Sequence, residues 1–364
     1  MTPPAINSSD TRGLTLDTST RQAIFYMKTD IALPNHRLRG LQKEAAIELQ
    51  ARIPAVAQLA EEHDFAGTVA PLAAGSFHVV HKIERADAAA AVMRSTLYGL
   101  FDIDRSLNLE RRVAVWLGAN GHLVPATLAS GIRDDGAPFD FALLEMARGA
   151  SLRDLGDATL DENPRLLDSV GASLRLIHET SASGAGLLDL EREYAIPAGV
   201  GLRWADYVPL RLDEHIRECV EAGYVDTPLE SRIRSLFEVM LPTLGDRPMR
   251  LLHGDPGTHN ICVDPATSAV TAWLDWEDAL VGDPLFDLAL LSSFQPPRRM
   301  PAAFEGYGLE DKNFDEKRLI AFYFLRIALS KTAHRIRFGI KDGPGRTPGH
   351  HRIYRGVDDL ERLL

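Results

Sequence analysis

The sequence predicts an α+β protein with two lobes, a small lobe of five antiparallel strands and a larger lobe that is mostly helical. A chain of 364 residues is too long for one compact core, because domains commonly hold about 50–200 residues. From Gly67 onward, short apolar runs separated by turns are typical of strands. After Gly149 the apolar residues recur at helical spacing. We therefore expect an N-terminal arm and helical extension over 1–65, the small lobe over 66–147 and the large lobe over 148–364.

The chain before the small lobe is expected to form a loosely ordered arm followed by helix. About thirty residues at the start are polar, rich in Ser and Thr, and weakly patterned. Between Leu38 and His63 apolar residues repeat at steps of three and four, and Pro54 lies inside this run. Proline removes a backbone donor and clashes with the preceding turn, so we expect a kink or two helices. In the simplest interpretation this run packs on a lobe; a homodimer formed through it is the alternative.

The small lobe is expected to contain three strands, a helix and two further strands, in that order. The strands are predicted over 68–77, 78–85, 89–94, 127–133 and 139–145, with the helix over 108–117. The turn Asp134–Asp135–Gly136 separates the last two strands. The large lobe is expected to be helical over 164–178, 204–222, 229–241 and from 288 to 337, with strands at 250–252, 261–263 and 270–274. A Gly/Pro-rich stretch over 343–349 predicts a surface loop.

Composition and charge exclude several kinds of partner. The formal net charge of -11 argues against nucleic acid and against an anionic membrane surface, because both require a surplus of Lys and Arg. No apolar run is long enough for a membrane helix. Cys219 and Cys262 lie far apart without metal-ligand spacing, which favours a reducing compartment. With no secretory signal pattern at the N-terminus, we expect a cytoplasmic protein.

The segment that carries chemistry runs from His253 to Asn260 and continues to Asp275. It places Asp255 and Asn260 five residues apart in a turn between apolar strands, and Asp275 after the next hairpin. Phosphoryl transfer needs a carboxylate that accepts or orients the proton of a hydroxyl, and oxygen ligands that hold magnesium on the phosphates. Magnesium prefers hard oxygen ligands and keeps several waters, so a carboxamide and one carboxylate suffice. Because His259 stands beside His253 and Asp255, a buried polar cluster or a transition-metal site is the alternative.

Three short motifs in order resemble the signature of the aminoglycoside phosphotransferase and choline kinase family, whose members are relatives of protein kinases that act on small molecules. The motifs are His253-Gly254-Asp255 with Asn260, then Leu274-Asp275-Trp276-Glu277, then Gly282-Asp283-Pro284 with Asp287-Leu288-Ala289. The resemblance runs from about residue 67 to at least 291. It implies a bilobal, protein-kinase-like fold that uses ATP and Mg²⁺ to phosphorylate the hydroxyl of a small molecule.

The resemblance assigns roles to residues of the large lobe. Asp255 matches the catalytic aspartate, and Asn260 and Asp275 match the magnesium ligands. Asp283 and Asp287 match acidic positions that brace the catalytic loop through hydrogen bonds. His253 is expected to support the same loop.

In the small lobe the resemblance implies a nucleotide site. The turn that contains Gly75 and Ser76 would cover the phosphates with backbone N–H groups. Arg94, where protein kinases carry a lysine, would contact the α- and β-phosphates and pair with Glu110. Lys82 is the alternative candidate for this phosphate contact. An ion pair at the surface is the alternative interpretation of Arg94 and Glu110.

The strand that ends at the hinge completes this expected nucleotide site. The backbone of Glu145 and Ala147 would bind the adenine edge. Such recognition through the backbone leaves almost no signature in the side chains. The two residues that bind adenine could therefore be shifted by one position along the chain.

The sequence does not identify the molecule that accepts the phosphoryl group. Helices expected around 187–241 and 295–337 would line its pocket, and the second region mixes acids with at least as many bases, including Lys331. This balance weakens an aminoglycoside interpretation; a solvated helix face and an acidic or phosphate-bearing acceptor are the alternatives. Another class of function is a catalytically inactive, nucleotide-binding regulatory protein of the same fold. A hydrolase is disfavoured, because the sequence has no Gly-x-Ser-x-Gly elbow.

Overall fold

The computed structural model describes most of the chain, which folds into two compact units. The described residues are 14–15, 18–27, 30, 35–75, 77–86, 89–97, 101–103, 106–118, 121, 123–190, 195–201, 203–245, 247–309, 313–340 and 348–364. The first unit comprises residues 1–16 and 33–148, and the second comprises 17–32 and 149–364. The predicted N-terminal arm and helical extension, 1–65, is therefore divided between the two units.

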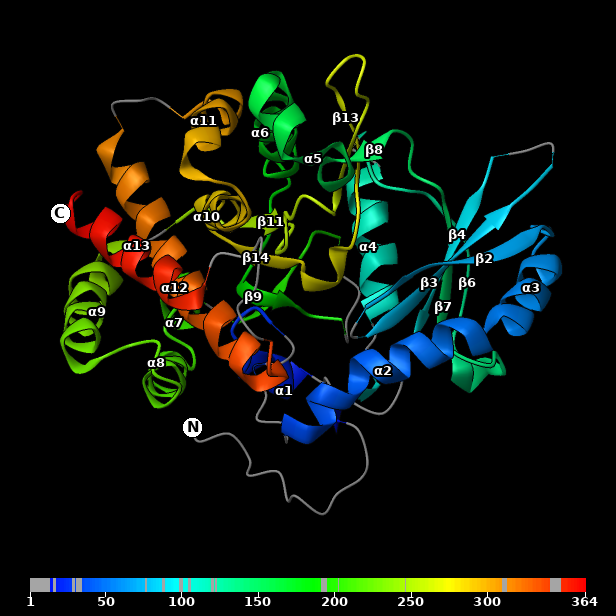
Figure 1. Ribbon diagram of the computed structural model, residues 1–364, viewed down its shortest axis with the longest axis horizontal. Coiled ribbons are helices and arrows are strands. Elements are labelled where there is room, and N and C mark those ends of the chain that lie inside the picture. The colour runs from blue at the N-terminus through cyan, green and yellow to red at the C-terminus, as the bar shows by residue number, and fades with distance from the viewer. Residues whose placement is uncertain are drawn as a thin grey trace. The chain divides into compact units, whose positions relative to one another are not determined.

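The first unit is built on a five-stranded antiparallel sheet in the order β2-β3-β4-β7-β6 (Figure 1). Its strands are β2 (Thr68–Ala74), β3 (His78–Glu84), β4 (Ala91–Thr96), β6 (Thr127–Gly131) and β7 (Phe141–Glu145). Helix α4 (Ser106–Gly118) lies between β4 and β6 in the chain. The five-stranded lobe and the order of its elements are thus confirmed. The short parallel pair of β1 (Leu14–Thr15) and β5 (Phe101–Ile103) was not predicted, because two or three residues carry no readable period.

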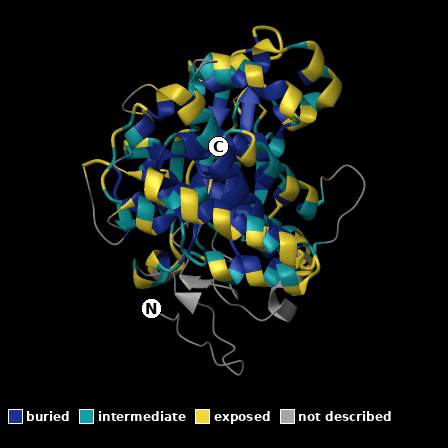
Figure 2. Cartoon of the chain, turned by 90° about the vertical axis from the view of Figure 1, so that its left-hand side faces the viewer, coloured by how far each residue is buried: buried dark blue, intermediate teal, exposed yellow. Residues whose placement is uncertain are grey.

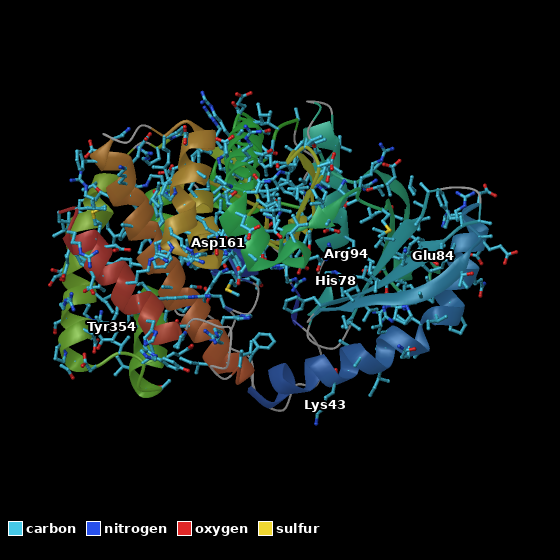
Figure 3. The ribbon with its side chains drawn as sticks, turned by 45° about the horizontal axis from the view of Figure 1, so that its top comes forward. Lys43, His78, Glu84, Arg94, Asp161 and Tyr354 are labelled. Atoms are coloured by element: carbon cyan, nitrogen blue, oxygen red, sulfur yellow. The ribbon has the colours of Figure 1, made fainter. Side chains whose placement is uncertain are left out.

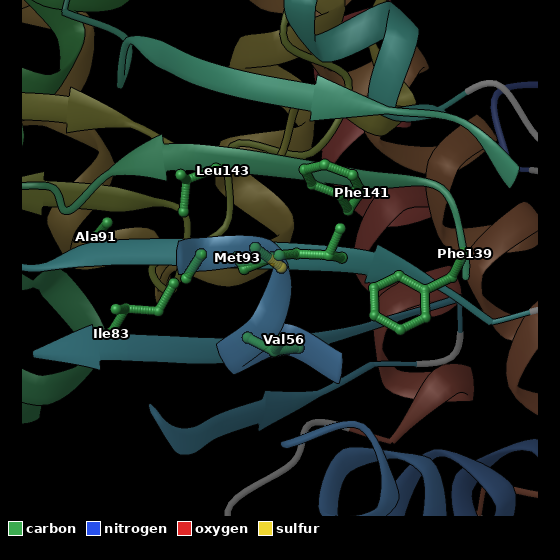
Figure 4. Packing of buried hydrophobic residues seen from close by; sticks show 9 residues of the cluster. Val56, Ile83, Ala91, Met93, Phe139, Phe141 and Leu143 are labelled. Carbon is green, nitrogen blue, oxygen red and sulfur yellow. The ribbon is translucent and has the colours of Figure 1, made fainter. Parts of the chain in front are cut away.

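Two helices precede this sheet, as Pro54 predicts. Helix α2 (Asn35–Ala51) ends before Arg52, and α3 (Ile53–Glu62) begins with Pro54 in its first turn, where a missing N–H costs nothing. Val56, Leu59 and Ala60 of α3 pack on inward-facing side chains of the sheet. These sheet residues include Ile83, Ala91, Met93, Phe141 and Leu143 (Figure 4). Because strand side chains alternate between faces, Ala91 and Met93 of β4 reach this core from the same face of the sheet.

The second unit is mostly helical. Its longer helices are α5 (Leu152–Glu162), α6 (Arg165–Ile177), α8 (Leu212–Glu221), α9 (Thr227–Met240), α10 (Leu285–Phe294), α11 (Met300–Tyr307), α12 (Phe314–Phe338) and α13 (Gly349–Glu361). Helix α12 is buried along most of its length, because α8, α10 and α13 pack against it. Exposed residues lie on the outer faces of the surrounding helices, with buried residues behind them (Figure 2). None of the helices in the described part of the chain has both the length and the apolar character needed to cross a membrane.

Several boundaries in the second unit differ from prediction. The helix expected over 204–222 is two helices, α7 (Trp204–Tyr207) and α8, because Pro209 and the left-handed backbone of Arg211 (φ 56°) interrupt it. Helix α13 was not predicted. Most of the expected Gly/Pro-rich loop lies outside the described residues. Four strands of two to four residues were also missed: β8 (Ala150–Ser151), β9 (Ala185–Leu188), β10 (Gly199–Gly201) and β14 (Leu280–Gly282).

A segment from the start of the chain belongs to the core of the second unit. We call it the N-terminal segment; its described residues are 18–27, which include α1 (Thr18–Gln22), and 30. The ring of Phe25 lies 3.5 Å from the guanidinium carbon of Arg326, and the amide of Tyr26 donates to the Tyr207 hydroxyl at 2.7 Å. Asp30 is buried, and its carboxylate contacts His215 and Arg337. The loosely ordered arm expected from composition is therefore wrong for these residues.

Candidate active site

The motif residues of the second unit lie where three short strands end. The loop 253–260 joins β11 (Arg250–Leu252) to β12 (Ile261–Val263), and Asp275 follows β13 (Val270–Trp273). Strands β12 and β13 pair with Ile261 opposite Trp273, and the amide of Leu274 donates to the Asn260 carbonyl at 2.8 Å. This pairing puts the two predicted magnesium ligands, Asn260 and Asp275, at the same end of one hairpin.

The structure brings Asp255 and Asn260 into direct contact. The side-chain amide nitrogen of Asn260 donates to the backbone carbonyl of Asp255 at 3.0 Å and to its Oδ2 at 3.2 Å. Since the nitrogen makes both contacts, the amide oxygen of Asn260 is turned away from Asp255. The Asp255 side chain is 23% exposed, so a small molecule can reach it.

A buried carboxylate on α10 fixes the backbone of the loop. Asp287 accepts hydrogen bonds from the amide of His253 at 2.6 Å and from the amide of Gly254 at 3.0 Å. It also lies 3.2 Å from Nε2 of His178. These contacts match the bracing role expected of Asp287. Asp283 acts elsewhere, because its carboxylate contacts Arg247 and Tyr323 rather than the loop.

The ring of His253 ties the loop to the neighbouring hairpin. Its Nε2 lies 2.9 Å from the Leu274 carbonyl, and its Nδ1 accepts from the amide of Asp255 at 3.2 Å. Burial lowers the pKa of His253, which favours the neutral ring that these two bonds require. The expected supporting role of His253 agrees with these contacts.

Gly254 occupies a position that only glycine fits. Its φ is +82°, and a Cβ added there would lie 1.9 Å from the carbonyl oxygen of Asp278. We expect Gly254→Ala to displace the loop and to destabilise the fold by more than the roughly 1–3 kcal/mol that a strained backbone conformation costs by itself. Gly223→Ala is the matched control, because Gly223 has φ +76° but no atom within 4 Å of the added Cβ. Thermal unfolding of both variants measures the difference; equal losses would show that the contact with Asp278 does not matter.

Two further side chains contact Asp255 that the motifs did not indicate. Nζ of Lys331, on α12, lies 3.6 Å from Oδ1 of Asp255, and Nε2 of His259 lies 3.6 Å from Oδ2. Burial by itself raises the pKa of Asp255, but Lys331 and then His259 outweigh it and lower that pKa, so the carboxylate is ionised at neutral pH. The only sequence signal for Lys331 was its place in a basic helix, where a solvated face was the default interpretation.

In the first unit, Arg94 and Glu110 form the expected ion pair. Both residues are buried, and Nη2 of Arg94 also lies 3.3 Å from Nδ1 of His78 (Figure 3). The alternative of a surface ion pair is therefore wrong. Lys82 instead pairs with the exposed Glu84 at 2.6 Å.

The other nucleotide candidates are only partly described. The amide of Gly75 donates to the His78 carbonyl at 2.8 Å, so this N–H closes the hairpin and is already used. Ser76 lies outside the described residues. At the end of β7 the amide of Glu145 donates to the Ala126 carbonyl at 3.0 Å, and half-buried Ala147 follows the strand.

A transition-metal site at His253, Asp255 and His259 was the alternative to magnesium chemistry. Within the described ranges, no group of three or more His, Cys, Asp or Glu side chains is placed to hold a metal ion. Magnesium needs fewer protein ligands, because it keeps much of its water shell. The donor set of Asn260 and Asp275 therefore suits magnesium better than zinc or iron.

Comparison with known proteins shows which family the chain resembles. Residues 76–322 match the model of the phosphotransferase enzyme family, APH. Over 186 residues the chain is 28% identical to human acyl-CoA dehydrogenase family member 11, covering 50% of this chain and 23% of that protein. Over 162 residues it is 26% identical to hygromycin-B 4-O-kinase of Escherichia coli, covering 43% of this chain and 44% of the kinase. The aligned regions thus span less than half the length of these curated relatives.

Solved structures share the fold at low sequence identity. Aminoglycoside phosphotransferase APH(4)-Ia, in a ternary complex with AMP-PNP and hygromycin B, matches with a TM-score of 0.61 at 17% identity, over 85% of this chain and 97% of that chain. A choline/ethanolamine kinase family protein from Mesorhizobium loti matches with a TM-score of 0.54 at 16% identity, over 88% and 94%. These matches confirm the predicted fold class, and kinases of this family use ATP and Mg²⁺. Since the family model covers more than half of the chain, the protein belongs to the phosphotransferase enzyme family.

Proposed function

We propose that this protein transfers the γ-phosphoryl group of ATP to a hydroxyl of a small molecule, with Asp255 as the catalytic base. The observation that carries the proposal is the contact between Asp255 and Asn260 in a loop braced by Asp287. An ionised carboxylate in a rigid, partly exposed loop can accept a hydroxyl proton without first losing one of its own. The proton would pass from the acceptor oxygen to a carboxylate oxygen of Asp255 as that acceptor oxygen bonds to the γ-phosphorus. The bond between the γ-phosphorus and the β–γ bridging oxygen breaks at the same time, and ADP leaves with that electron pair.

Asn260 and Asp275 are the residues that would hold magnesium. Both offer hard oxygen donors from the same end of the β12–β13 hairpin. Asp275 has φ +63°, a conformation that is rare for residues other than glycine and that concentrates at functional sites. When bound, magnesium neutralises charge on the phosphates. The protein's own contribution is to fix these donors beside Asp255.

The first unit supplies the proposed nucleotide contacts. Arg94 would meet the phosphates, and its pairing with buried Glu110 holds the guanidinium in one orientation. Backbone groups near Gly75 and Ser76 would add phosphate contacts, and those of Glu145 and Ala147 would bind adenine. Because the amides of Gly75 and Glu145 already have partners, other backbone groups of these segments must make the contacts.

The acceptor is proposed only as a class, namely a small molecule with a free hydroxyl, such as an antibiotic, a sugar or an amino alcohol. Support comes from the similarity to a hygromycin-B kinase and to a choline/ethanolamine kinase family protein. The test is a screen for ADP release with MgATP and a panel of hydroxylated metabolites and antibiotics. Nucleotide binding without acceptor-dependent ADP release across the panel would favour the inactive regulatory alternative.

Removing the carboxylate of Asp275 should weaken the magnesium-dependent part of ATP binding. We expect Asp275→Ala to lower ATP affinity by about 10–100-fold with magnesium and to change it little without magnesium, in the range seen when metal sites are disturbed. Calorimetric titration of ATP with and without magnesium gives both values. Asp264→Ala is the matched control, because Asp264 caps the turn at the opposite end of the same hairpin. If magnesium changes the ATP affinity of Asp275→Ala as much as it changes the ATP affinity of the parent, the assignment of Asp275 as a magnesium ligand is wrong.

A further inference from the structure

Lys331 is a largely buried cation beside the proposed catalytic base. Its side chain is only 12% exposed, and its Nζ lies 3.6 Å from Oδ1 of Asp255. The same Nζ lies 3.7 Å from the centre of the Phe294 ring, at the last residue of α10. A cation over the face of an aromatic ring is attracted to it, so the ring and the carboxylate hold the ammonium between them. Two elements, α10 and the loop, therefore fix the position of a group carried by a third, α12.

The contacts of Lys331 complete a frame around the Asp255 carboxylate. Asn260 and His259 approach Oδ2, and Lys331 approaches Oδ1. With donors on both oxygens, rotation of the carboxylate about its terminal bond would break a contact on one side or the other. Asn260 and His259 belong to the same loop as Asp255 and move with it, whereas Lys331 belongs to a buried helix. Lys331 therefore ties the carboxylate to the rigid core of the second unit.

We propose that Lys331 is a positioning residue for phosphoryl transfer, which holds the Asp255 carboxylate in the orientation that accepts the proton of the acceptor hydroxyl. This inference rests on the proposed function of Asp255. It assigns to this chain a fixed cation on α12 that contacts the base from outside the catalytic loop. A loss of orientation at the reacting group lowers the rate of the chemical step more than it weakens nucleotide binding.

The protonation state of Lys331 gives the proposal a second, independent readout. Burial lowers the pKa of Lys331 to about 8, although Asp255 acts in the opposite direction. Among the described residues, Asp278, Arg352 and His334 of the same helix also interact electrostatically with Lys331, and His259 of the loop lies on the other oxygen of Asp255. Lys331 is thus charged at neutral pH, and its contribution is lost as the pH rises through about 8. Arginine at this position would keep its charge throughout that range.

The experiment compares Lys331→Met, Lys331→Arg and Asp255→Asn in the full-length protein, with MgATP and an acceptor found in the screen. We expect Lys331→Met to lower kcat by about 10–100-fold while the KM for ATP changes less than about twofold, the pattern of an interaction made in the chemical step. Lys331→Arg should recover most of kcat at pH 7, and its activity relative to the parent should rise between pH 7 and pH 9. Lys317→Met, about 21 Å along the same helix from Lys331, is the control and should behave like the parent.

Each outcome separates this inference from the proposed function. One outcome is that Asp255→Asn loses turnover while Lys331→Met has the parental kcat or a higher one. This outcome would overturn the positioning role of Lys331 and leave Asp255 as the base. Full turnover in Asp255→Asn would overturn the proposed base and the inference with it. If Lys331→Met unfolds at the assay temperature, the Arg variant decides alone, because a pH profile identical to the parent's would also overturn the role.

Discussion

Asp255→Asn is expected to lower turnover by about 10²–10⁴-fold, the range that general-base catalysis contributes. Asparagine has nearly the same shape and keeps an oxygen that can accept from Asn260 or Lys331, so the loop should hold its conformation. The amide cannot accept the hydroxyl proton. ATP affinity should therefore stay close to the parent's value while turnover falls.

Turnover and nucleotide titration on the same preparation of Asp255→Asn check this prediction. Asp315→Asn is a suitable control, because Asp315 is an exposed carboxylate in the first turn of α12 that pairs with Arg318 of its own helix. A variant that turns over at the parental rate would exclude Asp255 as the base. A variant that loses ATP binding as well would place Asp255 among the phosphate or metal contacts instead.

Asp30→Ala is expected to destabilise the second unit by about 3–5 kcal/mol, the usual cost of removing one partner from a buried ion pair. Asp30 is 2% exposed. Its carboxylate contacts His215 and lies 3.1 Å from Nη1 of Arg337, and Oδ2 accepts from the amide of Phe25 at 2.8 Å. Without Asp30, the buried guanidinium of Arg337 keeps Glu218 as a partner but loses the Asp30 carboxylate. Thermal or urea unfolding, monitored by fluorescence, measures the loss of stability.

The matched control for Asp30 is Asp213→Ala. Asp213 also pairs with an arginine, Arg234, at 2.7 Å, but its side chain is 83% exposed. Exposed pairs contribute only about 0–1 kcal/mol, so this variant should unfold close to the parent. Similar losses in the two variants would show that burial of the Asp30 network does not contribute to stability.

The same network around Asp30 makes the stability of the fold depend on pH. Burial alone would raise the pKa of Asp30, but His215, Arg337 and Arg211 lower it to about 2. A carboxyl whose folded pKa lies below its unfolded value of roughly 3.9 stabilises the fold fully above that value. The contribution is lost as the pH falls towards 2, where the folded form is protonated. Asp30→Ala should therefore have a flatter acid-unfolding profile than the parent.

Local patterns in the sequence were sufficient for the five-stranded sheet of the first unit and for the catalytic loop. Short apolar runs bounded by turns predicted β3, β4 and β7, because each of these strands places apolar side chains in the core. The contact between Asp255 and Asn260 followed from a turn of fixed length between two strands. In both cases the interacting residues are close in the sequence, so spacing alone restricts their geometry.

Contacts between distant segments could not be predicted in this way. Lys331 meets Asp255 only because α12 packs beside α10, and helical periodicity gives no information on which helix will be the neighbour. The N-terminal segment was expected to be loosely ordered from its polar composition, but Phe25 and Tyr26 fill an aromatic cluster with Tyr207 and Phe286. The apolar run Ala23-Ile24-Phe25-Tyr26-Met27 was the available signal of this burial.

The placement of the N-terminal segment has a consequence for synthesis on the ribosome. Asp30 and Arg337 are 307 positions apart, so at roughly 5–20 residues per second about 15–60 s separate their translation. The intervening first unit is nearly continuous in the chain and can fold during that time. Phe25 and Tyr26 must wait for Tyr207, Phe286 and Arg326, which are made later, and until then their exposed rings are available to chaperones or to neighbouring nascent chains.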